Sequence, residues 1–220
     1  MKKMVFFLIL IYVCPAYLLA QTTWTVGIGD IYDFSSLQQA HNGAEPNDVI
    51  LLQQGGNYGG VTLTKSLIIK GPGYYLQENE IVNANQLSAS LGSITFNVGS
   101  EGSFITGINT SIIVNNGSDN IVIDRCKITS NIVFNDVSNV LIRDCLISGR
   151  LSNNSGINTQ IFFENCVFEF DSDCSSSSCY LFYLISSWSN CTFNHNIFID
   201  PSGSSIGQIN INYCISALVN

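Results

Sequence analysis

A short pattern of apolar and polar residues recurs along the second half of the chain. It is clearest in residues 139–147, which read NVLIRDCLI. With Cys145 as the reference position of the repeat, the equivalent residues are Ile108, Cys126, Cys166, Cys191 and Cys214, separated by 18, 19, 21, 25 and 23 residues. A period of this size is typical of solenoid proteins, in which each repeat forms one turn of a stack.

Apolar residues occupy four positions of most repeats: five and three residues before the reference, the reference itself, and two residues after it. This spacing predicts two short strands joined by a bend, because an uninterrupted strand would keep the same parity throughout. The bend position holds mostly residue types that tolerate a left-handed backbone. Its residues are Gly107, Arg125, Asp144, Asn165, Asn190 and Tyr213.

The repeat therefore predicts an all-β fold, a parallel β-helix of about seven to eight coils. A leucine-rich repeat would need a Leu-x-x-Leu-x-Leu framework, which the sequence lacks. Pro72 lies 36 residues before Ile108, twice the shortest repeat. We therefore expect one further coil between them, within residues 81–96.

Residues 1–20 have the composition of a secretory signal peptide. Lys2 and Lys3 precede an apolar run that ends at Leu19, and the small residue Ala20 follows. Residues 14–16 interrupt the run, which leaves it too short for a membrane-spanning helix, so cleavage is favoured over anchoring. No second apolar run of spanning length follows. We expect a secreted or cell-surface protein with no membrane span after signal removal.

Residues 21–48 predict an N-terminal cap, and residues 49–220 the β-helix. In the cap, Phe34, Leu37 and Ala40 fall on one face of a helical turn that can cover the open apolar end of the stack. Asp33 or Ser35 would be the N-cap residue, and Gly43 would follow the helix.

The segments NDVILL (residues 47–52), NY (57–58) and VTLTKSLIIKGPG (61–73) closely resemble the N-terminal cap and first coil of the pectin-lyase-like superfamily. Asn47-Asp48 stands where that family commonly has Gly-Asp, a departure that a turn can absorb. With the repeats, the resemblance covers nearly the whole mature chain and implies a right-handed β-helix. It implies no single activity, because this fold hosts lyases, hydrolases, adhesins and inert stalks.

The mature chain is strongly acidic. Two of the eight basic residues leave with the signal peptide and none of the sixteen acidic residues does, so six bases stand against sixteen acids, a formal net charge of −10. This charge speaks against nucleic acid and anionic membranes as partners.

The position two residues before the reference holds Asp124, Arg143 and Glu164 on three successive repeats. We interpret them as an exposed charge ladder; the alternative is that Arg143 acts as a catalytic base between carboxylates. His41 and His195 have no Ser, Cys or Asp partner at motif spacing. No catalytic or cofactor-binding residue is therefore assigned.

A calcium ion is the one cofactor for which the sequence offers ligands. Glu101 and Asp119 lie seven residues before their reference positions and should stack on neighbouring coils, with Asp136 in the next turn. Carboxylates this close repel one another unless a cation bridges them. Calcium prefers six or more oxygen ligands, and the sequence supplies two or three carboxylates.

Seven cysteines remain after signal removal. Because the odd number leaves one unpaired and stacked side chains run parallel, we expect the five at reference positions to be buried thiols rather than disulfides. Cys174 and Cys179 lie in the longest interval and predict a local disulfide in an exposed insertion. Zinc would require Cys-x-x-Cys pairs, which are absent.

Six residues follow Cys214, too few to complete a coil. We therefore expect the chain to be a fragment with an incomplete C-terminal end, open to end-to-end self-association.

The sequence favours a secreted or cell-surface module with a binding or structural role that contacts polysaccharide or another cell-surface component. Tyr74, Tyr75, Tyr180 and Tyr183 are candidate sugar-stacking residues. The alternative is a polysaccharide lyase or glycoside hydrolase, which the resemblance alone implies.

Overall fold

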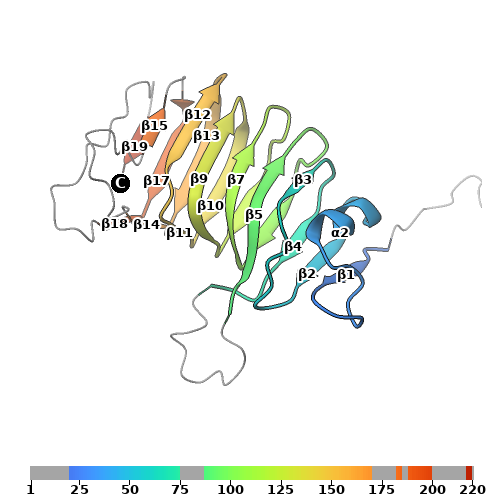
Figure 1. Cartoon of the computed structure of the whole chain (residues 1–220). Coiled ribbons are helices and arrows are strands. Elements are labelled where there is room, and N and C mark those ends of the chain that lie inside the picture. The colour runs from blue at the N-terminus through green and yellow to red at the C-terminus, as the bar shows by residue number, and fades with distance from the viewer. Residues whose placement is uncertain (1–19, 75–86, 170–181, 185–187, 200–216, 220) are drawn as a thin grey trace, which may run out of the picture.

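The computed structural model describes residues 20–74, 87–169, 182–184, 188–199 and 217–219. The predicted signal peptide up to residue 19 and the predicted disulfide between Cys174 and Cys179 lie outside these ranges. Two long parallel sheets run along the molecule (Figure 1). No helix in the described ranges is long and apolar enough to cross a membrane.

The first sheet, here called sheet A, contains ten strands. In spatial order they are β1 (Thr23–Val26), β2 (Val49–Leu52), β4 (Ile68–Lys70), β6 (Phe104–Thr106), β8 (Val122–Asp124), β10 (Ser138–Arg143), β13 (Asn158–Glu164), β17 (Cys191–Asn194) and β19 (Ala217–Val219), with β16 (Trp188–Ser189) also paired to β13.

The second sheet, sheet B, contains nine strands. They are β3 (Val61–Leu63), β5 (Ala89–Phe96), β7 (Ile108–Val114), β9 (Lys127–Asn135), β11 (Leu146–Ile147), β14 (Val167–Glu169) and β18 (Ile197–Ile199), with β12 (Leu151–Ser155) and β15 (Phe182–Leu184) on a branch that starts at β9. The chain alternates between the sheets, so β2 to β18 make seven coils. The predicted all-β, parallel β-helix-like architecture is confirmed.

The core lies between the two sheets and consists of the predicted inward positions. Ile105, Ile123, Ile142 and Phe163 lie opposite one another in neighbouring strands and are fully buried. The bend is also as predicted, because Gly107, Arg125, Asp144 and Asn165 have φ angles of 71°, 47°, 53° and 52°. A left-handed residue at each bend turns the chain from sheet A into sheet B.

The predicted alignment of the last coils is wrong. Phe163 lies opposite Phe193, not Trp188, and Trp188 lies opposite Asn158 instead. The reference position of this coil is Asn196, preceded by His195 with a φ of 54°, rather than Cys191 preceded by Asn190. Stacked aromatic pairs, Phe163 with Phe193 and Phe168 with Phe198, fit this register. Val219 lies opposite Phe193, which stands three residues before its reference position. Val219 therefore takes that same place in its own coil, so Cys214 is not a reference position either.

The coil expected between Pro72 and Ile108 does not exist. Strand β4 pairs directly with β6, with Ile69 opposite Ile105. The additional residues instead form β5 and its connection to β4, which includes residues 75–86. Because β4 pairs directly with β6, a spacing of twice the repeat did not require a second coil.

The capping helix is α2 (Leu37–Gly43), at the N-terminal end of the stack (Figure 1). Leu37 and Ala40 are fully buried in the core. The N-cap is Ser36, whose hydroxyl accepts from Gln39 N, and not Asp33 or Ser35 as predicted. Gly43 is the last helical residue rather than the one beyond it.

The turn before β2 holds the cap together. Asn47 has a φ of 72°, so it replaces glycine in a left-handed position. The buried Asp48 carboxylate accepts hydrogen bonds from Thr22 N, Trp24 Nε1 and Glu45 N at 2.7, 2.9 and 2.9 Å. Burial alone would raise the pKa of Asp48, but these bonds outweigh it and hold the pKa below its ordinary value.

Candidate functional site

The outer face of sheet A carries a row of apolar side chains. Strand residues alternate between the core and the outside, and the outward residues four before the reference position lie opposite one another in β4, β6, β8, β10 and β13. These residues, here called the apolar column, are Ile68, Phe104, Val122, Leu141 and Phe162. All five are half-buried. In the next coil Thr192 follows them.

No described helix covers the apolar column. The single helix in the described ranges, α2, packs against β1 and β3 at the N-terminal end. The outward positions of a solvated sheet are usually polar, which gives a strand alternating apolar and polar residues. The segment IVID (residues 121–124), which contains β8, places apolar residues on both faces, with Ile121 and Ile123 fully buried and Val122 half-buried. The column is therefore partly exposed apolar surface that lies outside the core.

A row of exposed amides borders the column on one side. Asn120, Asn139, Gln160 and Asn190 have left-handed φ angles between 54° and 60° and are exposed. Asn139 Nδ2 donates to Asn120 Oδ1 at 2.5 Å. This amide row continues along the stack beside the apolar column and offers both hydrogen-bond donors and acceptors.

The charged residues predicted from the sequence form the other border. Thr106, Asp124, Arg143 and Glu164 lie opposite one another in successive strands, as expected, but Asn194 rather than Ser189 follows Glu164. The interpretation as an exposed ladder is wrong for Asp124, which is 3% exposed.

The Asp124 carboxylate is buried because neighbouring donors enclose it. Arg143 Nε donates to Oδ1 at 2.8 Å, Arg125 Nε to Oδ2 at 2.9 Å, and Thr106 Oγ1 to Oδ2 at 3.1 Å. Burial would raise the pKa of Asp124, but the bonds from Arg143, Arg125 and Thr106 lower it overall. The hydrogen bond to Asp124 raises the pKa of Arg143, which therefore stays protonated and is poorly suited to act as a base.

The carboxylates of the three calcium candidates each accept hydrogen bonds from other residues. Glu101 Oε1 accepts from Gly99 N, and Asp119 Oδ1 accepts from Ser138 N. Asp136 accepts from Asn116 Nδ2 and Ile157 N. Glu101 and Asp119 are in neighbouring coils, where Gly102 N donates to Asp119 O. Within the described ranges, no three His, Cys, Asp or Glu side chains group as metal ligands. Calcium at these residues stays a prediction.

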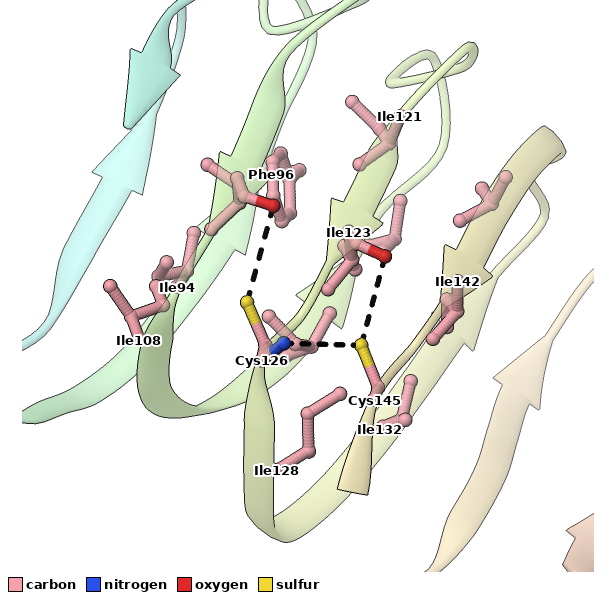
Figure 2. Close-up of a cluster of buried hydrophobic side chains, with 14 of the residues drawn as sticks. Ile94, Phe96, Ile108, Ile121, Ile123, Cys126, Ile128, Ile132, Ile142 and Cys145 are labelled. Carbon is pink, nitrogen blue, oxygen red and sulfur yellow. Dashed lines mark hydrogen bonds between the residues drawn. The ribbon is translucent and has the colours of Figure 1, made fainter. Parts of the chain in front are cut away.

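Three reference cysteines form a row inside the stack, and Figure 2 shows two of them, Cys126 and Cys145. Cys126, Cys145 and Cys166 are buried free thiols. Cys145 Sγ lies 3.1 Å from Arg143 O and 3.7 Å from Ile123 O, and it accepts from Cys126 N at 3.4 Å. Burial raises the pKa of the Cys145 thiol well above its ordinary value, whereas a hydrogen bond with Cys145 lowers that of Cys166. Because all three thiols are buried, out of reach of a substrate, we assign the row to packing rather than to a nucleophile. Cys191 is also buried but lies opposite Ile161, five residues before the reference position, so it is not part of the row.

The two histidines have different settings. His41 is buried on α2, and its Nε2 accepts from Thr64 N at 3.1 Å. Nε2 must therefore be unprotonated, which leaves Nδ1 to donate to Asn42 Oδ1 at 3.2 Å. Burial lowers the pKa of His41. His195 is an exposed bend residue. Neither forms a catalytic arrangement with a described nucleophile.

Of the tyrosines suggested for sugar stacking, Tyr74 donates to Asp144 O at 3.3 Å across the outside of the bends. Tyr75 and Tyr180 lie outside the described ranges, and only the backbone of Tyr183, in β15, is described. The aromatic side chains of the apolar column, Phe104 and Phe162, were not among the sequence candidates. They could have been recognised as apolar residues between two inward-facing ones.

Comparisons of this chain with protein-family models, curated proteins and solved structures found no match. The resemblance to the pectin-lyase-like superfamily therefore stays a prediction, and the site must be interpreted from its own geometry.

Proposed function

We propose that the mature chain is an exported binding module, a right-handed parallel β-helix that contacts carbohydrate through the outer face of sheet A. The observation that carries the proposal is the apolar column, in which consecutive coils present half-buried apolar side chains outward. A contiguous, partly exposed apolar row with polar borders favours a binding surface. Right-handedness is favoured because about 98% of crossovers between parallel strands of one sheet have that hand.

Carbohydrate suits this surface because a sugar ring has apolar C–H faces and a rim of hydroxyl groups. Phe104 and Phe162 can pack against the faces, and the amide row can donate to and accept from the hydroxyls. Polar groups beside an apolar surface fix the orientation of a ligand that the apolar contacts hold.

Export is supported by the lysines, apolar run and small residue of the first 20 positions. N-terminal sequencing of the protein recovered from culture medium should find Gln21 as the first residue. Recovery of the uncleaved chain from the cytoplasm alone would contradict export.

The binding test is a panel of soluble and insoluble polysaccharides, with affinity measured by calorimetry and by depletion. Phe104→Ser and Phe162→Ser should weaken binding about tenfold each, because each removes one packing surface. Ile113→Ser is the matched control, since Ile113 is a half-buried outward residue of sheet B. Equal loss in all three variants would contradict the assignment of the face. Release of shortened or unsaturated sugars would instead show a lyase or hydrolase.

End-to-end self-association belongs to the same proposal. Ile197 and Ile199 in β18, the last described strand of sheet B, are 58% and 43% exposed. Light scattering should show concentration-dependent growth that Ile197→Ser with Ile199→Ser reduces. A monomer at all concentrations would exclude it.

A further inference from the structure

The apolar column is narrow and runs along the stack axis, across the strands. Each coil contributes one side chain, and strands in a sheet are about 4.8 Å apart. Five coils in succession therefore present a straight row, one contact per coil. A ligand that uses the whole row must be extended, with a repeat close to the coil spacing.

The size of the row argues against a protein partner. Five half-buried side chains expose on the order of 300 Å² together. A stable interface between two proteins, including two copies of this chain, buries about 800 Å² on each partner. A single polymer chain needs only a narrow strip of contact, so it fits the row better.

The charges beside the row argue for an uncharged polymer. Asp124 is already bound by Arg125 and Arg143, so these three groups neutralise one another in part. The opposite border consists of neutral amides. An acidic polymer would meet a mature chain with ten more acidic than basic residues.

We infer that the apolar column binds an uncharged, extended polysaccharide, aligned with the stack axis, with about one sugar ring per coil. This inference rests on the proposed function and names its ligand class. The apolar ring faces pack on the column, and the hydroxyls on one edge of the polymer reach the amide row. The partly neutralised Asp124 cluster borders the other edge.

The test measures the affinity of the mature protein for cello-oligosaccharides of two to eight units. Affinity should rise with each unit up to about five and then level off, because five coils carry the column. Binding should be nearly independent of salt, since no ion pair forms. Val122→Thr keeps the side-chain shape but replaces one methyl group with a hydroxyl, and it should weaken binding about tenfold. Ile113→Thr on sheet B is the matched control, and urea unfolding midpoints show that each variant is folded.

The outcomes separate the inference from the proposed function. Binding of polygalacturonate that weakens with salt, without binding of neutral oligosaccharides, would overturn the inference and leave a carbohydrate-binding module. Affinity that does not change with oligosaccharide length would overturn the alignment along the axis. Failure to bind any carbohydrate would overturn both proposals, and a dimer lost in Val122→Thr would assign the column to a second copy of the chain.

Discussion

The ring of Phe193 lies parallel to that of Phe163 in the neighbouring coil, with centroids 4.8 Å apart and planes inclined by 8°. Trp188 instead packs edge-on against Phe134, with centroids 5.5 Å apart. These contacts identify which residues of the last coils follow the earlier ones. They also mean that the register of the last coils can be tested by measuring the interaction between these rings.

Double-mutant cycles should detect the register directly. Phe163→Leu with Phe193→Leu, and Phe134→Leu with Trp188→Leu, should each show a coupling energy of about 0.5–1.5 kcal/mol in urea unfolding. The pair Phe163 and Trp188 is the control and should be nearly additive. Strong coupling there, with none to Phe193, would restore the alignment that the repeat spacing predicts.

The Asp124 cluster should stabilise the middle of the stack. Arg143→Ala removes one donor to a buried carboxylate and should lower the free energy of unfolding by about 1–3 kcal/mol. Lys70→Ala, in the same outward position of β4 but exposed, should change it by less than about 0.5 kcal/mol. Since the pKa of Asp124 is lowered, its contribution is present above the ordinary value of 3.8 and is lost as pH falls through the lower folded-state pKa. Equal effects of both variants would contradict the cluster's role.

The three reference cysteines should be unreactive until the protein unfolds. Burial of Cys126, Cys145 and Cys166 keeps reagents away from the three sulfur atoms. The raised pKa of Cys145 also suppresses formation of its thiolate. Mass spectrometry after iodoacetamide treatment should find these residues unmodified in native protein and modified in urea without reductant. Modification that requires reductant in urea would reveal disulfides instead.

His41 should make the N-terminal cap sensitive to mild acid. Its pKa is lowered in the folded protein, so the unfolded chain takes up the proton first as pH falls below the ordinary value of 6.5. The free energy of unfolding should therefore decrease from about pH 7 to pH 5. His41→Gln, which can still accept from Thr64 N, should flatten this decrease, whereas His195→Gln should not. An unchanged pH dependence in His41→Gln would show that another group is responsible.

The sequence by itself determined the repeating unit. Inward residues such as Ile123 and Ile142, and bend residues such as Asp144 and Asn165, follow from local chemistry: alternation sets the strand faces, and left-handed tolerance sets the bend. The capping helix was equally predictable from Leu37 and Ala40. Its N-cap is Ser36 rather than the predicted Asp33 or Ser35, because all three residues are good caps.

Only the tertiary structure decided which repeats are neighbours and what their outer faces carry. Cys191 fits two alignments by spacing, and the pairing of Phe163 with Phe193 selects one of them. The sequence pattern predicted that Asp124 is a surface charge. In the structure its carboxylate is buried, because Arg143 and Thr106 on the adjacent coils donate hydrogen bonds to it. The apolar column exists only once Phe104 and Phe162 are aligned with the strands between them, because residues tens of positions apart meet through strand pairing, which local patterns do not encode.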